Sequence, residues 1–230
     1  MSEFLSSSLF FALALSLVSY ELGSWLRKKT KLAIMNPLLI AIIIVIAVLL
    51  IFHIDYSEYE RGSSLLNYML TPATVALAIP LYRQIHVLKK YGVSIGFGVL
   101  AGVLTSLVGA LVLAVLFQLT HEEYVTFLPK SITSAIGMGM SEELGGIVTI
   151  TIAIIVVTGI VGNVMAETVC KVFRIKEKVA IGLAIGTSSH AMGTTKALEM
   201  GEVEGAMSSL AIVLAGILTV VAANVFAMLY

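Results

Sequence analysis

The sequence predicts an all-α, polytopic integral membrane protein, and its composition is the first observation that does so. Hydrophobic residues make up 59% of the 230 residues and charged residues only 12%, proportions well outside those of soluble globular domains. The 14 basic and 14 acidic residues balance, so the chain lacks the net charge that would recruit nucleic acid. We therefore expect the lipid bilayer, and no nucleic acid, among its partners.

Long apolar stretches are the second observation. A helix needs about 20 apolar residues to cross a hydrocarbon core about 30 Å thick, and six stretches are expected to do so. They are residues 5–26, 32–54, 65–82, 93–117, 147–172 and 205–229. Pro72 and Pro80 interrupt the third stretch.

Two more segments, residues 128–146 and 179–200, are too rich in Gly, Ser and Thr for ordinary spans. Basic residues at positions 27–31, 83–90 and 171–178 place those loops in the cytoplasm. The first segment then precedes a helix that runs from outside to inside, so it must enter and leave on the outer face. The second dips in from the cytoplasm; if it crosses completely instead, the C-terminus lies inside.

A self-comparison pairs these two re-entrant segments. Laying residues 131–145 over 187–201 matches Ala135 with Ala191, Gly137 with Gly193, Glu143 with Glu199 and Gly145 with Gly201, and the following helices match Gly159 with Gly216. Opposite faces of entrance would make this an inverted repeat, as in many secondary transporters. Chance matching within a small alphabet of residues is the alternative. We treat residues 1–230 as one transmembrane domain, with N-terminal helices to residue 60 and the transport core from 61 to 230.

Three breaks in helix-forming sequence are the candidate binding site, because non-helical chain at membrane depth is tolerated only inside protein or beside a water-filled cavity. Half-helix N-termini and neutral hydroxyls at such breaks suit a small anion. No run of intramembrane acids accompanies them, so we expect no metal site and no cofactor, and the Ser–His neighbours form no catalytic pair, so we expect no enzyme. The candidate substrate-binding residues are Thr71, Thr74, Lys130, Ser131, Thr133, Ser134, Ser188, Ser189, His190, Gly193, Thr194 and Thr195.

Two ionisable residues have specific predicted roles in binding and proton coupling. His190 sits inside a re-entrant segment, where a neutral imidazole could take up a proton together with an anionic substrate; the alternative is that it only donates to backbone carbonyls. Lys130 could pair with a substrate carboxylate, or it could extend its ammonium to the membrane surface.

Small residues also recur every four positions from Gly98 through Gly102, Ser106 and Ala110 to Ala114. The stretch "GFGVLA" has the spacing of a dinucleotide-binding fingerprint, but no strand precedes it. We interpret these residues as a face for close helix packing.

The motifs "PATVALAIPLY", "LPKSITSAIGMGMSEELGG" and "GLAIGTSSHAMGTTKALEMGEVEGAMSSLA" together resemble those of the LrgB/CidB family over essentially the whole chain. The resemblance implies a multi-pass protein of the bacterial plasma membrane and two functions. One is a holin- or antiholin-like regulator of murein hydrolase activity and autolysis, with a small LrgA/CidA-type membrane protein as partner. The other is a carrier of small carboxylates such as pyruvate, lactate, glycolate or glycerate, as in the plant plastidal glycolate/glycerate translocator.

Between these two functions, the broken segments favour the carrier. A hole needs only self-association and a wide pore, whereas a carrier needs a small, pre-organised site. We therefore expect a secondary-type carrier that binds its anion near the bilayer midplane, with the lysis regulator as the alternative, and we expect a homo-oligomer.

Overall fold

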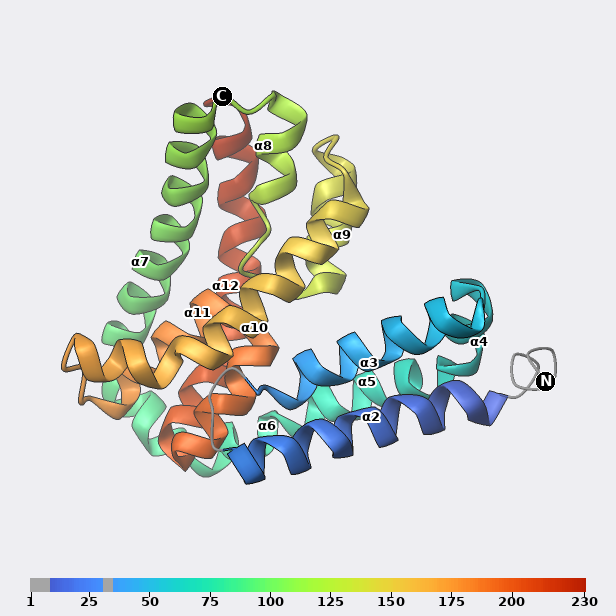
Figure 1. The fold of residues 1–230 in the computed structure, drawn as a ribbon. Helices are drawn as coiled ribbons and strands as arrows, with labels where there is room; N and C mark the ends of the chain where they lie inside the picture. Colours follow the sequence, from blue (N-terminus) through green and yellow to red (C-terminus); the bar gives the residue numbers. More distant parts are fainter. Residues whose placement is uncertain (1–8, 31–34) are drawn as a thin grey trace. The chain divides into compact units, whose positions relative to one another are not determined.

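The computed structural model describes residues 9–30 and 35–230, and the described chain is helical, as predicted (Figure 1). Residues 5–8 and 32–34, at the starts of the first two expected spans, and Lys31 of the first basic loop lie outside the described residues. The chain divides between Ala76 and Leu77 into two compact units. The first unit holds the N-terminal helices and the second holds both re-entrant segments.

In the first unit, α2 (Leu9–Thr30) packs against α3 (Pro37–Phe52) and α4 (Tyr56–Gly62), and α5 (Ser64–Ala76) follows. Asn36 fixes the start of α3, since its side chain accepts from the amides of Leu38 and Leu39 while Pro37 occupies the first turn. Helices α2 and α3 approach closely at Gly23, where a Cβ would lie 2.6 Å from the carbonyl oxygen of Pro37.

Four apolar helical stretches of the described chain are long enough to cross a membrane, namely 64–83, 85–117, 148–172 and 202–227. Helix α3 is apolar but has 16 residues, and α2 is not among the four. Helical stretches thus occupy the positions of all six predicted spans. Four of them are also long and apolar enough to cross a membrane. All of this is consistent with a multi-pass membrane protein.

The third predicted span is broken, as expected, but between its prolines. Helix α5 ends at Ala76 and α6 (Ala78–Arg83) begins two residues later. Pro80 lacks the amide that would bond to the carbonyl of Ala76, so the hydrogen-bond ladder stops there. Pro72 lies inside α5 without ending it.

The second unit contains α6, α7 (Ile85–Phe117), α8 (His121–Phe127), α9 (Ser134–Glu143), α10 (Val148–Val172), α11 (Lys178–Met200) and α12 (Glu202–Ala227). Helix α7 kinks at Tyr91, where φ is −112° and ψ is 15°, so its straight part corresponds to the predicted span 93–117. Its buried face packs against α11 and α12 (Figure 1).

The first predicted re-entrant segment, residues 128–146, is part of a hairpin, which we call hairpin 1, of α8, a turn and α9. Its first limb, α8, precedes residue 128, so the predicted segment begins too late. The amide of Ile147 donates to Thr126 Oγ1 at 2.9 Å, and Thr151 Oγ1 donates to the carbonyl of Thr126 at 3.1 Å. Helix α8, the first limb of the hairpin, therefore lies beside the start of α10, which follows the second limb. At the other end, Gly137 lies against Pro129 and Ile155, so the chain turns back near the middle of α10.

The second predicted segment, α11, is also a hairpin, which we call hairpin 2. A continuous helix would separate Gly182 from Glu204 by about 33 Å at 1.5 Å per residue, yet Gly182 contacts the Glu204 carbonyl. The reversal occurs at His190, whose φ of 41° and ψ of −139° are not helical. Residues 178–189 therefore descend and residues 191–200 return, as the re-entrant interpretation predicts.

Helix α12 then carries the chain to the end of the bundle where α7 ends. Tyr124 Oη in α8 donates to the carbonyl of Phe226 at 2.9 Å, and Tyr230 Oη donates to the carbonyl of Leu119 at 2.6 Å. The C-terminus thus lies on the side of the α7–α8 loop, opposite the basic α10–α11 loop. Under the positive-inside assignment this side is the outer one.

Contacts repeat between the two hairpins with the offset that the sequence alignment gives, 56 residues in the hairpins and 57 in the helices that follow. Thr126 meets Thr151 as Gly182 meets Ser208, Pro129 meets Gly137 as Ile185 meets Gly193, and Ile136 meets Gly216 as Met192 meets Gly159. Helices α10 and α12 run toward opposite ends of the bundle, because α10 begins beside Thr126 and α12 ends beside Tyr124. Chance similarity of small residues would not reproduce matched contacts, so we conclude that the segments form an inverted repeat.

Candidate functional site

Both hairpins line a cavity of about 1060 Å³ in the second unit. Helices α7 and α10, the tip of hairpin 1 and the descending limb of hairpin 2 form its walls. Its lining residues are Tyr91, Ser94, Gly98, Gly102, Thr105, Ser106, Lys130, Ser131, Val157, Thr158, Val161, Gly162, Glu177, Val179, Ala180, Leu183, Ala184, Thr187, Ser188 and Ser189. Four of the predicted binding residues, Lys130, Ser131, Ser188 and Ser189, are brought together here.

The small-residue face of α7 lets hairpin 2 approach. A Cβ on Gly102 would lie 2.6 Å from Thr187 Oγ1, and one on Gly98 would lie 3.1 Å from Leu183 Cδ1. Farther along the same face, Ala110 and Ala114 are buried. The interpretation of this face as a packing surface is confirmed, and it also forms one wall of the cavity.

Lys130 is the one cation among the residues that line this cavity. Its Nζ donates to Ser106 Oγ at 3.0 Å and to Ser131 Oγ at 3.2 Å, and these two hydroxyls lie 2.9 Å apart. No ion pair found in the described chain involves Lys130. The side-chain nitrogen is therefore oriented by neutral oxygens, and no carboxylate of the described chain pairs with it.

Lys130 lies deep in the bundle rather than at its surface. Its partner Ser106 is 11 residues before the end of α7 at Phe117, which is about 16 Å along the helix axis and about half of a 30 Å hydrocarbon core. The side chain of Lys130 thus lies beside the middle of α7 rather than reaching toward Phe117, because its nitrogen is held at the level of Ser106.

The hydroxyls of hairpin 2 at the cavity are partly occupied within their own helix. Thr187 Oγ1 donates to the carbonyl of Leu183 at 2.8 Å, while Ser188 Oγ and Ser189 Oγ lie 3.0 Å apart. Hydroxyls that bond back to the preceding turn keep an acceptor lone pair but commit their proton. Lys130 is therefore the strongest donor available to an anion.

His190 does not line the cavity. Its ring is buried, and Nε2 lies 3.1 Å from the carbonyl oxygen of Ile155 in α10. Since a carbonyl only accepts, Nε2 carries the proton of this bond. Its ring also contacts Gly159, where a Cβ would lie 2.8 Å from Cε1. The geometry corresponds to the backbone-bonding alternative; proton coupling through His190 stays a prediction.

The remaining predicted residues of the two hairpins support the fold. Gly193 fits against Ile185 and Ser189, and Thr194 Oγ1 bonds to the carbonyl of His190 at 2.9 Å and to Ser208 Oγ at 2.7 Å. Thr195 Oγ1 bonds to the carbonyl of Met192 at 2.7 Å. Thr133 precedes α9 and Ser134 begins it, without a side-chain cap.

The predicted anion site at half-helix N-termini is not the cavity. The lining residues of hairpin 2 lie along its whole descending limb and just before it, from Glu177 to Ser189, whereas Ser134, at the N-terminus of α9, and the N-terminal residues of the returning limb are outside it. The reason is that hairpin 2 reverses at a single residue, His190, so its second limb begins against α10 rather than against the cavity.

Thr71 and Thr74 lie in α5 of the first unit and are not among the cavity residues. Thr71 is exposed, and the side chain of Thr74 is not described. Substrate binding by these two threonines stays a prediction.

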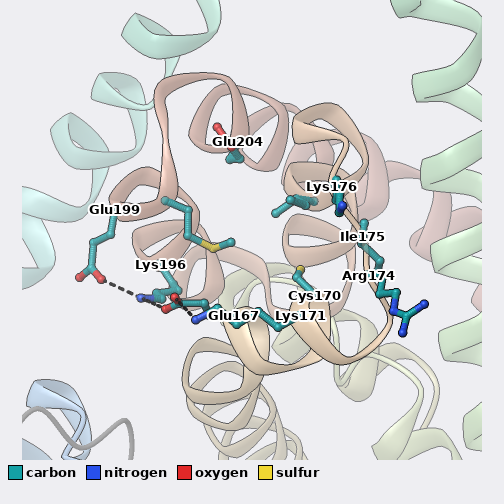
Figure 2. A pocket seen from close by; sticks show the side chains of 11 residues that line it. Glu167, Cys170, Lys171, Arg174, Ile175, Lys176, Lys196, Glu199 and Glu204 are labelled. Carbon is teal, nitrogen blue, oxygen red and sulfur yellow. Dashed lines mark hydrogen bonds and ion pairs between the residues drawn. The ribbon is translucent and has the colours of Figure 1, made fainter.

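A second cavity, of about 600 Å³, lies at the basic end of the second unit (Figure 2). Lys196 of hairpin 2 lies 3.1 Å from Glu167 Oε2 and 3.4 Å from Glu199 Oε2, and Lys171 lies 2.9 Å from Glu167 Oε1. Exposed ion pairs of this kind contribute about 0–1 kcal/mol each. They join α10 to the returning limb, whereas Arg174 points away from them (Figure 2).

Sequence reasoning missed several residues of the site. Ser106 had been assigned to helix packing, and Thr187 and Thr158 had not been singled out. The available signal was weak: Ser106 is one small residue in a long apolar helix, and only the approach of hairpin 1 shows which side of α7 faces Lys130.

Comparisons with known proteins give a consistent result. The model of the LrgB-like family matches residues 16–229. The chain is 37% identical over 221 residues to the antiholin-like protein LrgB of Bacillus subtilis (strain 168), covering 96% of each chain. It is 35% identical over 218 residues to the proteins of the same name from Bacillus mycoides (strain KBAB4) and Bacillus cereus (strain B4264), covering 94% of this chain and 95% of each relative. No solved structure matches the chain.

Proposed function

This chain belongs to the LrgB-like family, and we propose that it acts as an antiholin-like membrane protein that regulates murein hydrolase activity and autolysis. The observation that carries this proposal is its similarity over nearly the whole length to relatives named antiholin-like protein LrgB. The sequence favours a carrier, with this function as the alternative, whereas the similarity to named relatives supports this function better than a carrier. A small LrgA/CidA-type membrane protein is the proposed partner.

Complementation tests the antiholin-like function. The chain is expressed in a Bacillus subtilis strain that lacks its own antiholin-like protein, and autolysis is followed by turbidity after a standard trigger. We expect the chain to restore the parental lysis rate. An unchanged rate, with the protein present in the membrane fraction, would contradict the proposal.

A second candidate, a carrier of small carboxylates, is favoured by the cavity. Lys130 is a basic side chain that two neutral hydroxyls hold in a cavity lined by both hairpins. A desolvated charge at membrane depth is costly and marks a functional pathway by default. An anion would neutralise it, and the cavity's other charged residue, Glu177, lies beside the basic loop, at the start of α11.

The two functions can coexist in one protein. Transport of an acid changes the proton and metabolite balance across the membrane, and an effect on lysis could follow from that change or from the partner. The cavity is enclosed by three helices and contains one lysine. This arrangement supports a saturable binding site better than it supports a wide pore.

Proteoliposomes distinguish the two kinds of permeation. We expect saturable uptake of labelled pyruvate, lactate, glycolate or glycerate, at least tenfold lower in Lys130→Gln and unchanged in Lys89→Gln, whose side chain is exposed on α7. Leakage of an entrapped dye without saturable uptake would remove the carrier candidate and leave the antiholin-like function standing.

A further inference from the structure

The cavity of about 600 Å³ at the basic end of the second unit contains more charge than its ion pairs use (Figure 2). Four basic and three acidic residues line it, which gives a formal net charge of +1. The ion pairs join two of the basic residues to two of the acidic ones. No ion pair found in the described chain involves the other three charged lining residues, which are Arg174, Lys176 and Glu204.

Glu204 lacks a partner although it is buried. It lies in the first turn of α12 and is only 6% exposed. Its Oε2 is one of two buried side-chain polar atoms in the described chain that have no hydrogen-bond partner, and a Cβ on Gly201 would overlap this oxygen. An ionised carboxylate only accepts hydrogen bonds, and a buried acceptor without a donor is costly. A donor on a ligand in the cavity would remove that cost.

Arg174 and Lys176 lie in the loop that follows α10, which is cytoplasmic under the positive-inside assignment. Val172 and Phe173, directly before them, are 69% and 72% exposed. Exposed apolar side chains next to exposed cations are typical of the boundary between acyl chains and headgroups, and basic pockets between helices at this level bind anionic headgroups. The cavity therefore lies at the level of the phospholipid headgroups.

The unpaired charges fit one kind of headgroup. A phosphodiester carries one negative charge, which balances the formal charge of the cavity and suits hydrogen bonds from Arg174 and Lys176. A neutral hydroxyl on the same headgroup supplies the donor that Glu204 lacks. A phosphate without a donor leaves Glu204 unpaired, whereas a zwitterionic headgroup leaves the net positive charge unbalanced.

We propose that this cavity binds the phosphoglycerol headgroup of an anionic phospholipid, with the phosphate on Arg174 and Lys176 and a glycerol hydroxyl on Glu204. The site is separate from the cavity at Lys130, and the proposal depends on neither candidate function. Helices α10 and α12 and both limbs of hairpin 2 contribute lining residues, so a bound headgroup stabilises the packing of hairpin 2 against both helices.

Short-chain lipids test the proposal on the purified full chain in detergent. Binding is measured by calorimetry for the dihexanoyl forms of phosphatidylglycerol, phosphatidate, phosphatidylethanolamine and phosphatidylcholine, and for soluble glycerol phosphate. We expect phosphatidylglycerol to bind about tenfold more tightly than phosphatidate, because only its headgroup donates to Glu204. The two zwitterionic lipids and glycerol phosphate are expected to bind more weakly than phosphatidylglycerol.

Two matched pairs of variants separate the site from general surface charge. Glu204→Gln keeps the shape of the side chain and should remove most of the preference for phosphatidylglycerol over phosphatidate. Glu202→Gln, at an exposed acid in the same turn outside the cavity, should leave that preference unchanged. Lys176→Gln should weaken binding of both lipids about tenfold, whereas Lys178→Gln, at an exposed lysine outside the cavity, should not.

The outcomes decide different points. If phosphatidylglycerol and phosphatidate bind the parent protein equally, Glu204 accepts no ligand donor and the proposal is overturned. If Lys176→Gln and Lys178→Gln weaken binding equally, the attraction comes from the whole basic surface and the proposal is again overturned. Because Lys176 is exposed, this second result stands even where Glu204→Gln fails to fold. If glycerol phosphate binds as tightly as phosphatidylglycerol, the ligand is a soluble phosphate ester and the lipid part of the proposal fails.

Discussion

Hairpins 1 and 2 have the same contacts to the helix that follows each of them but different tips. Hairpin 1 turns through residues 128–133 and presents Lys130 to the cavity, whereas hairpin 2 reverses at His190, which is bound to α10. The residue aligned with Lys130 is Gly186, which lies against Ser208 and Ala211. The two hairpins thus pack alike, but only hairpin 1 presents a basic side chain to the cavity, whereas the turn of hairpin 2 is hydrogen-bonded to α10. We therefore expect ligand binding at positions where the two halves of the repeat differ.

The tight contact of hairpin 2 with α12 should be the most sensitive point of the repeat. A Cβ at Gly186 would overlap the carbonyl oxygen of Ser208, and backbone cannot move aside cheaply. We expect Gly186→Ala to reduce the free energy of unfolding by about 1–3 kcal/mol, measured as a lower Tm in nanodiscs. Gly139→Ala in hairpin 1, where a Cβ meets nothing within 4 Å, is the control and should leave Tm equal or higher; equal losses in both variants would refute the contact.

Substitutions of His190 distinguish a structural role, through its hydrogen bond to α10, from a role in substrate binding or proton coupling. His190→Ala loses the bond to Ile155 and keeps a backbone conformation that disfavours a Cβ, whereas His190→Gly loses the same bond and relieves the strain. The glycine variant should therefore be more stable than the alanine variant by about 1 kcal/mol. If both variants match the parent in Tm but abolish uptake equally, the histidine acts on substrate or protons instead.

One hydroxyl pair in each half of the repeat compares the two halves. Ser141 Oγ lies 2.7 Å from Thr151 Oγ1, and Thr194 Oγ1 lies 2.7 Å from Ser208 Oγ. Thr151 and Ser208 are aligned residues, whereas Ser141 aligns with Ala197. We expect Thr151→Val and Ser208→Ala each to lower the free energy of unfolding by about 1 kcal/mol. A large loss from one variant and none from the other would show that the repeat is not equally important in its two halves.

The smallest effect is expected at the exposed end of hairpin 1, at the start of α8. The amide and hydroxyl of Thr120 both donate to Glu123, and these bonds lower the pKa of this carboxyl below its usual range. Its stabilising effect is therefore present above the unfolded-state pKa and is lost as the pH falls through the folded-state pKa. Glu123→Gln should show a slightly lower Tm than the parent at neutral pH and the same Tm in acid; a constant difference across pH would contradict the assignment.

The sequence predicted much of this fold because charge and composition constrain a membrane chain strongly. Loop lysines located the two re-entrant segments, and their Gly, Ser and Thr content marked them as breaks. The sequence predicted interruptions at both Pro72 and Pro80, whereas the break that the structure shows follows from Pro80 alone, since a missing amide affects the carbonyl four residues earlier.

The site itself was less predictable, because its partners are distant in sequence or are backbone atoms. Ser106 and Lys130 are 24 residues apart and meet only when hairpin 1 folds against α7. The partner of His190 is the carbonyl of Ile155, a group that every residue carries, so no sequence pattern could identify it.

The reversal of hairpin 2 at His190 is the central claim, and the side of the membrane on which the C-terminus lies tests it most directly. Single cysteines are placed at His121, Lys176 and Leu229, each exposed, with Cys170→Ala as background, and labelled in intact cells by a membrane-impermeant maleimide. The structure predicts that His121→Cys and Leu229→Cys label from the same side and Lys176→Cys only after permeabilisation. Labelling of Leu229→Cys together with Lys176→Cys would mean that α11 crosses the membrane completely and would contradict the repeat.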